Sequence, residues 1–284
     1  MKLLFNLFLL ILTSQYCFAQ QFEYVRSIGK FESASAFYIN STGRLFITDD
    51  VTNEVYKLDT LGQVIESIGG YGWDENAFDD PVDIFADPLK VLVTDKNNNR
   101  IQKFDKDLNY IAQIYTKESD SESEQFGYPL SAVTSNLGDV FILDSENKRI
   151  LKFDPFGKFS QTIGGYDYGK FALNNPKKLA ISMSNNIYVI DDNNIYVYDN
   201  YGTGIGSFPA NDEMISIRII FNWLALNSTD KVYLVDLRSK DKILNNVILS
   251  GIDIKDNIVS SLMFNSKLYI LTKNKILIFI AKKD

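Results

Sequence analysis

The side chains that could do chemistry in this chain are aromatic rings, amides, guanidinium groups and a few charged residues between positions 71 and 178. Rings with nearby amides and guanidinium groups are typical of sites that bind a peptide or a sugar, by stacking and by directed hydrogen bonds. A structural role is the competing interpretation, because such rings can fill gaps and the two arginines are spaced to pair with neighbouring acids. The candidate binding residues are Tyr71, Trp73, Asp83, Asn98, Arg100, Tyr128, Arg149, Tyr166, Tyr168 and Lys178.

Two residue types that are common in enzyme active sites are missing or nearly so. The chain has no histidine, and its single cysteine is Cys17. Nucleophilic systems that pair serine or cysteine with histidine are therefore excluded. We predict no catalytic residue, no metal site and no cofactor.

One sequence segment occurs three times and determines the architecture that we expect. The copies are LFITDDVTNEVYKLD (45–59), VLVTDKNNNRIQKFD (91–105) and VFILDSENKRILKFD (140–154). Each predicts an apolar strand that ends in an acid, a polar turn, and a second strand that ends in another acid. A repeat of this length, built from strands and turns, is typical of a β-propeller.

Six repeats can be aligned on the residue that ends the first of these strands, and we call these six residues the anchors. A short carboxylate at a strand end can accept hydrogen bonds from N–H groups of the following turn, which gives the anchor a structural role. The alternation in residues 101–105 predicts a half-buried strand after that turn. The last three repeats keep the strand pattern but lose much of the polar turn. The anchors are Asp49, Asp95, Asp144, Asp191, Asn227 and Thr272, which lie 36 to 49 residues apart.

The connections between repeats share glycine and proline. Gly69-Gly70 and Gly164-Gly165 follow predicted outer strands, and a proline opens the next inner strand at Pro81, Pro129 and Pro176. Segments 95–105 and 144–154 both read D-x-x-N-x-R-I-x-x-F-D. This pattern resembles the repeats of NHL-type propellers, although the first copy has Glu54 where arginine is expected. The resemblance implies the fold and says little about function.

The two ends of the chain predict how the ring closes. The sixth repeat stops after its third strand, and residues 23–29 resemble the outer strands of other repeats. We therefore predict an all-β fold for residues 20–284: one six-bladed β-propeller with four-stranded antiparallel blades. The N-terminal strand completes the last blade, which removes exposed sheet edges.

In such a fold the loops between blades and the turns after the anchors share one face, around the mouth of a central channel. The predicted inner strands line this channel. Polar residues near their starts are Ser35, Asp83, Ser131, Lys177, Lys178, Ser216, Arg218 and Ser260.

Six-bladed lactonases, strictosidine synthase-like proteins and amidating lyases are similar in architecture. Among the families that the chain resembles in architecture, the zinc-dependent lyases need several imidazoles and the streptogramin lyase-like enzymes use a histidine base. A chain without histidine therefore lacks these chemistries. A calcium-centred lactonase would need several oxygen ligands around one ion, and Asp83 is the only carboxylate placed at an inner-strand start.

Residues 1–19 have the pattern of a secretory signal peptide: Lys2, an apolar stretch over residues 3–12, and small residues before the cleavage point. We expect cleavage after Ala19 and export to the periplasm or the extracellular space. Lipid attachment at Cys17 is the alternative, and the bulky Tyr16 before it disfavours that reading. No later apolar stretch is long enough to predict a transmembrane helix.

These observations lead to three hypotheses. The first is an exported, monomeric, non-catalytic propeller that binds a peptide, protein partner or glycan through its loop face. The second is a metal-dependent lactonase-type or lyase-type enzyme, and the third is a structural module of an envelope assembly. Nucleic acid is excluded as a partner because the net charge is −7.

Overall fold

The computed structural model describes residues 20–210, 212–240 and 244–282. The signal peptide predicted for residues 1–19 lies outside these ranges. Within them the chain forms six β-sheets and a short 3-10 helix, η1 (Gly169–Phe171). No helix in the described ranges has the length and apolar character needed to cross a membrane.

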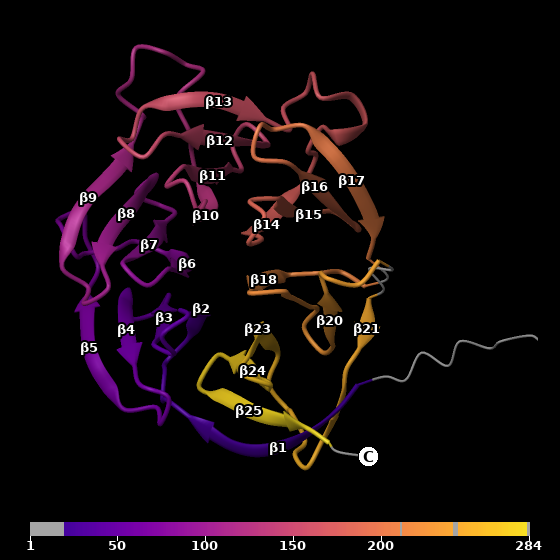
Figure 1. Cartoon of the computed structure of the whole chain (residues 1–284). Coiled ribbons are helices and arrows are strands. Elements are labelled where there is room, and N and C mark those ends of the chain that lie inside the picture. The colour runs from indigo at the N-terminus through magenta and orange to yellow at the C-terminus, as the bar shows by residue number, and fades with distance from the viewer. Residues whose placement is uncertain (1–19, 211, 241–243, 283–284) are drawn as a thin grey trace, which may run out of the picture.

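The six sheets are arranged as blades around a central axis (Figure 1). In the first three blades the strands follow chain order from the axis outward. Blade 1 contains β2 (Ala34–Ile39), β3 (Leu45–Asp49), β4 (Glu54–Leu58) and β5 (Val64–Gly69). Blade 2 contains β6 (Pro81–Ala86), β7 (Lys90–Asp95), β8 (Arg100–Asp105) and β9 (Tyr110–Tyr115). Blade 3 contains β10 (Pro129–Thr134), β11 (Val140–Asp144), β12 (Arg149–Phe153) and β13 (Phe159–Ile163).

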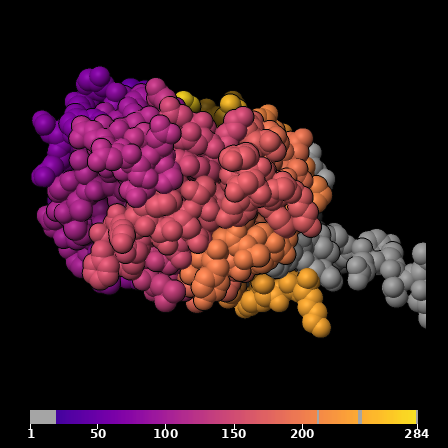
Figure 2. Space-filling model, turned by 90° about the horizontal axis from the view of Figure 1, so that it is seen from above, coloured from indigo at the N-terminus to yellow at the C-terminus, as the bar shows by residue number. Residues whose placement is uncertain are grey.

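The last three blades follow the same plan, with changes at the outer edge. Blade 4 contains β14 (Pro176–Ile181), β15 (Ile187–Asp191), β16 (Asn194–Tyr198) and β17 (Gly204–Pro209). Blade 5 contains β18 (Ser216–Ile220), β19 (Trp223–Asn227), β20 (Val232–Asp236) and the two-residue β21 (Asn245–Asn246). Blade 6 contains β23 (Ile258–Phe264), β24 (Lys267–Thr272), β25 (Ile276–Ala281), β1 (Gln21–Ile28) and β22 (Ile248–Ser250). Consecutive blades are neighbours, so the colours change in order across the side of the molecule (Figure 2).

The anchor carboxylates tie the loops of one face together, as the repeat predicts. Asp49 Oδ2 accepts the N–H groups of Glu32 and Ser33, which lie in the loop before β2, at 2.8 and 2.9 Å. Its Oδ1 accepts Val51 N–H, in the turn after β3, at 3.0 Å. Because one carboxylate bonds both segments, the entry loop and the hairpin turn of a blade are held on the same face.

The middle strands are more deeply buried than their alternation predicts. We expected Ile101–Asp105 to be half-buried, yet Gln102 is as fully buried as Ile101 and Phe104. Blades stack face to face, so both faces of an inner or middle strand are covered by a neighbouring blade. Only the outermost strands, such as β5 and β9, are exposed along much of their length.

Ring closure follows the prediction and includes one strand that the sequence did not indicate. β1 pairs antiparallel with β25, from Phe22 opposite Ala281 to Ile28 opposite Ile276. In addition, β22 pairs parallel with β1, with Gln21 opposite Ile248. Blade 6 therefore has five strands rather than the four expected, because the segment that leaves the short β21 of blade 5 continues across the outside of β1.

The closure predicts unequal effects for two substitutions in β1. Phe22 is fully buried and packs with Phe279 and Leu277 in one apolar cluster, whereas Val25 is 48% exposed. We expect Phe22→Ala to lower the free energy of unfolding by about 3–5 kcal/mol in urea titrations, because it leaves a cavity beneath the paired strands β1 and β25. Val25→Ala is the matched control and should change it by about 0.5 kcal/mol or less. Equal effects of the two changes would contradict this role for β1.

Candidate functional site

Four inner strands bring polar side chains together inside the channel, and we call Asp83, Ser131, Lys178 and Arg218 the channel cluster. Each follows by two positions the residue that pairs with its blade's anchor, for example Pro81 opposite Asp95. In β6, β10 and β14 a β-bulge separates the two positions, and a bulge re-aims the side chain that follows it. β18 has no such bulge, so Arg218 lies one pairing step further along its strand.

Asp83 is the centre of the channel cluster. Its Oδ1 lies 2.5 Å from Arg218 Nη2 and 3.8 Å from Lys178 Nζ. Its Oδ2 accepts a hydrogen bond from the Ser131 hydroxyl. Arg218 is held from a second side, since its Nε donates to the Phe37 carbonyl at 3.1 Å. The Asp83 and Arg218 side chains are only 1% and 4% exposed, so this ion pair is almost entirely removed from solvent.

Lys178 is the charged member of the cluster that is most open to solvent, with a side chain 17% exposed. Its Nζ donates to the carbonyls of Val82 and Leu130 at 2.6 and 3.0 Å. An uncharged amine has two N–H donors and one lone pair. Two carbonyl acceptors therefore satisfy a neutral Lys178 completely and leave its lone pair free to accept a proton.

The surroundings of the cluster lower the pKa of both Asp83 and Lys178, which favours the ionised carboxyl and the neutral amine. Burial opposes ionisation of the Asp83 carboxyl, but the charges of Arg218 and Lys178 and the hydrogen bonds from Arg218 and Ser131 outweigh it, so its pKa is lowered. Burial lowers the pKa of the Lys178 ammonium, Asp83 raises it and Arg218 lowers it further, with a result of about 8. The cluster therefore holds a carboxylate that stays ionised and an amine that can exchange protons near neutral pH.

The donor set of the cluster does not fit a metal ion. One carboxylate lies within 4 Å of two cationic groups, which would repel a divalent cation. Across the part of the chain that the structure describes, no three Asp, Glu, Cys or His side chains are grouped closely enough to hold a metal.

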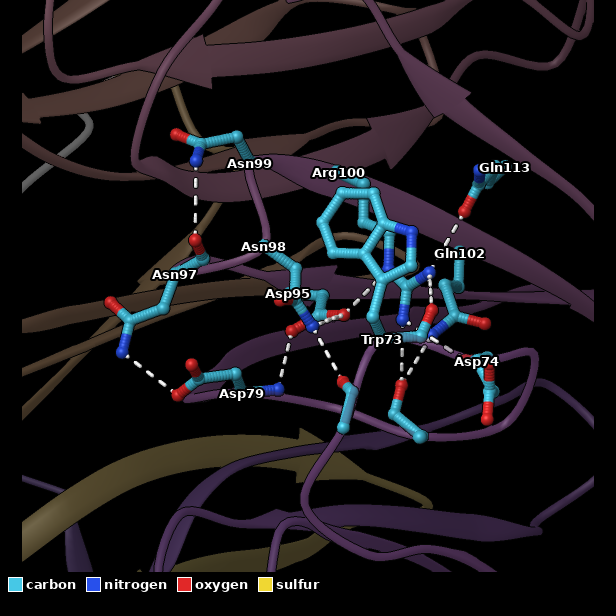
Figure 3. A network of polar contacts seen from close by, with 12 residues as sticks. Trp73, Asp74, Asp79, Asp95, Asn97, Asn98, Asn99, Arg100, Gln102 and Gln113 are labelled. Carbon is cyan, nitrogen blue, oxygen red and sulfur yellow. Dashed lines mark hydrogen bonds and ion pairs between the residues drawn. The ribbon is translucent and has the colours of Figure 1, made fainter.

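Three of the predicted binding residues form a separate network in blade 2 (Figure 3). Arg100 Nε lies 2.7 Å from Asp95 Oδ2, and the guanidinium also donates to the carbonyls of Trp73 and Ala77. The guanidinium lies 4.7 Å from the centre of the Trp73 ring, in a cation–π contact. Asn98 Nδ2 donates to Asp95 Oδ2 at 2.9 Å and to the Gly72 carbonyl at 2.8 Å. These contacts fix the loop between β5 and β6.

Of the remaining predicted residues, Arg149 begins β12 and the others lie in loops. Arg149 pairs with the anchor Asp144 at 3.1 Å and donates to the Gln125 carbonyl at 2.8 Å. Tyr168 is partly buried, and its hydroxyl donates to the Thr162 carbonyl at 2.8 Å. The other aromatic rings are largely exposed, at 78% for Tyr71, 48% for Tyr128 and 97% for Tyr166.

The structure thus joins only Asp83 and Lys178, of the ten predicted residues, in the channel cluster. Sequence reasoning does not single out Arg218 and Ser131, although both are among the polar residues predicted to line the channel. The available signal was their shared distance from the anchors.

Comparison with known proteins gives one local match in sequence. No protein-family model matches the chain. It is 30% identical over 132 residues to a probable peptidyl-alpha-hydroxyglycine alpha-amidating lyase of Caenorhabditis elegans. The match includes 44% of this chain and 38% of that protein, so it spans well under half of the relative.

Solved structures with the same fold include several lyases. A streptogramin B lyase has a TM-score of 0.66 at 12% identity, covering 91% of this chain and 98% of that one. Virginiamycin B lyase from Staphylococcus aureus has a TM-score of 0.61 at 13% identity, covering 90% and 99%. A catalytically inactive histidine-to-alanine variant of the latter, solved with quinupristin, has a TM-score of 0.61 at 12% identity, again covering 90% and 99%. At these identities the likeness establishes the propeller fold.

The hypothesis of a non-catalytic binding propeller is wrong in the light of these comparisons, and so is the expectation that the chain is no enzyme. The sequence relative and the structural neighbours are lyases. The absence of histidine, and of any cysteine other than Cys17, excludes only mechanisms that use imidazole or thiolate. It does not exclude a buried amine as a base, and that possibility was overlooked.

The blade 2 network predicts a difference between two arginines at equivalent repeat positions. Arg100→Met would leave the buried Asp95 without its ion-pair partner and several loop carbonyls without donors. We expect the free energy of unfolding to fall by about 3–5 kcal/mol in urea titrations. Arg149→Met is the matched control: Arg149 is more exposed and bonds fewer carbonyls, so its loss should cost about 1–3 kcal/mol. An equal or larger cost at Arg149 would refute the assignment.

Proposed function

We propose that this protein is a lyase-type propeller enzyme in which Lys178 acts as the general base. The observation that carries the proposal is the Lys178 amine, which has two carbonyl acceptors for its N–H groups, partial access to solvent and a pKa of about 8. A base is most effective when its pKa lies near the working pH. The lyase relatives support an enzyme, and the channel cluster supplies a group that can perform the step.

The reaction that suits this site is an elimination that needs no water and no cofactor. The neutral Lys178 amine takes a proton from a C–H or O–H group of the substrate. The electron pair of that bond forms a double bond, and the bond from the neighbouring carbon to the leaving group breaks. The Lys178 ammonium then gives its proton to the leaving group. Atoms and charge balance, and the amine is regenerated.

Asp83 and Arg218 act as positioning residues in this scheme. Asp83 is ionised and lies 3.8 Å from Nζ, so it stabilises the Lys178 ammonium that forms during the step. The positive charge of Arg218 opposes protonation of Lys178 and so lowers the pKa of the Lys178 ammonium toward neutral pH. Ser131 and the Phe37 carbonyl fix the two partners, so the electrostatic field at Nζ is set before substrate binds.

The proposal differs in one respect from the lyases with the same fold. The virginiamycin B lyase variant in which a histidine is replaced by alanine is inactive. This chain has no histidine, so a lyase reaction here requires a different base. Lys178 is the described residue whose contacts and lowered pKa suit that role.

The finer features belong to the same proposal. We place the chain among NHL-type propellers on the strength of segments 95–105 and 144–154, and we propose that it is exported and acts as a monomer. The exposed rings of Tyr71, Tyr128 and Tyr166 lie in loops that lead into inner strands, and we propose that they contact a peptide or glycan part of the substrate.

Substitutions at Lys178 test the proposal with two probes, a peptidyl-α-hydroxyglycine and quinupristin. We expect turnover of at least one by the wild type. Lys178→Met should lower kcat by about 10²–10⁴-fold. Lys178→Arg should also be inactive, because a guanidinium group keeps its proton and cannot act as a base. The control is Lys177→Met, since the adjacent Lys177 pairs with the exposed Glu213 and should leave kcat within about twofold. Absence of turnover of both probes, or full activity of Lys178→Met, would overturn the proposal.

The pH dependence of kcat/KM gives a second test. Only the unprotonated amine can act as a base. The rate should therefore rise about tenfold per pH unit below pH 8 and level off above it. Asp83→Asn removes the nearby negative charge, so the inflection should move to lower pH. A rate that is flat between pH 6 and 9 would contradict Lys178 as the base.

A further inference from the structure

A cavity lies at the end of the channel opposite the loops that precede the inner strands, where those strands end. We call it the end cavity. Its lining residues come from the last positions of five of the six inner strands, β2, β6, β10, β14 and β18, and from the turns that follow them. Its volume is about 280 Å³, enough for a small organic molecule. The lining residues include Tyr38, Phe85, Asp87, Thr134, Met183 and Phe221.

The end cavity is separate from the channel cluster. The rings of Tyr38 and Phe85, on the inner strands of neighbouring blades, pack with centroids 5.0 Å apart. The Tyr38 hydroxyl donates to the Ile219 carbonyl at 2.8 Å, which fixes the ring in place. The space between these rings and Arg218 has no room for a water molecule. A ligand in the end cavity therefore does not reach Lys178.

The walls of the end cavity are apolar and partly open. Phe221 and Met183 are exposed at its rim, and Phe221 stacks on Phe264 with an interplanar angle of 20°. Phe221 also has a positive φ of 52°, which is unusual for a residue with a bulky side chain. An apolar concave surface open to solvent is typical of a ligand site.

Two polar groups define the chemistry that the end cavity could recognise. The Thr134 hydroxyl oxygen is buried and has no hydrogen-bond partner among the described residues. Asp87 is the only charged residue in the lining. The hydrogen bonds that its carboxylate accepts from Leu89 and Lys90 N–H, at 2.7 and 2.8 Å, both go to Oδ1. The cavity thus offers the negative charge of Asp87 between aromatic walls, and the unsatisfied Thr134 hydroxyl lies buried directly beneath its surface.

We propose that the end cavity binds a small organic cation, a primary amine with an aromatic or aliphatic body. Asp87 supplies the opposite charge, and the rings of Tyr38, Phe85 and Phe221 suit both an apolar body and a cation. An ammonium group has N–H donors that the Asp87 carboxylate can accept. A carboxylate ligand is disfavoured because Asp87 would repel it.

Three probes of matched shape test the proposal on the full protein: phenethylamine, 2-phenylethanol and phenylacetate. Binding is measured by NMR titration of resonances near the cavity. We expect the amine to bind about tenfold more tightly than the alcohol, and phenylacetate to bind more weakly than both. Tighter binding of phenylacetate than of phenethylamine would overturn the proposal.

Variants separate the end cavity from other surfaces. Asp87→Asn keeps an oxygen for the turn N–H groups and should lower amine affinity about tenfold while leaving alcohol affinity within about twofold. Thr134→Val should weaken the amine less than Asp87→Asn does. Leu89→Ala, on an exposed side chain outside the lining, and Lys178→Met should leave amine binding unchanged. An unchanged amine affinity in Asp87→Asn, or a loss in Lys178→Met, would show that the amine binds elsewhere.

Discussion

The pairing of β1 with β25 is the interaction on which the other features depend. Six stacked blades bring their inner strands to one axis only if the ring closes, and β1 is the strand that joins its two ends. The channel cluster takes one side chain from each of four blades, so its distances are fixed by the angle between neighbouring blades. A site assembled in this way needs no flexible loop to position it, because each member lies on a paired strand.

The anchor carboxylates extend this rigidity to the loop face. Asp95 bonds both an entry loop and Arg100, which in turn holds the loop that carries Trp73. Buried polar networks of this kind are stable only when every member is satisfied. The anchor carboxylates and the arginines that pair with them are therefore occupied with structural contacts, whereas the ring of Tyr166 remains exposed.

Sequence reasoning predicted the features that repeat and missed those that do not. The period, the anchors, the prolines at inner-strand starts and the closing strand can all be read from equivalent residues in successive copies. The meeting of Asp83 with Arg218 cannot, because it depends on a bulge in β6 and on its absence in β18, and such a bulge leaves no clear mark in the sequence. The lowered pKa of Lys178 could not be predicted for a different reason: the pKa of a lysine depends on burial and on neighbours that only the folded chain brings together.

The pairing of β1 with β25 also has a consequence for how the chain folds. Phe22 lies near the start of the chain and its partner Ala281 near the end, so β1 has no complement until the last blade has been synthesised. Contacts between such distant segments make folding slow, and an unpaired apolar strand invites association with other chains in the meantime. The chain is an open ring until β25 pairs with β1, and the lifetime of that open ring sets the interval in which such association can occur.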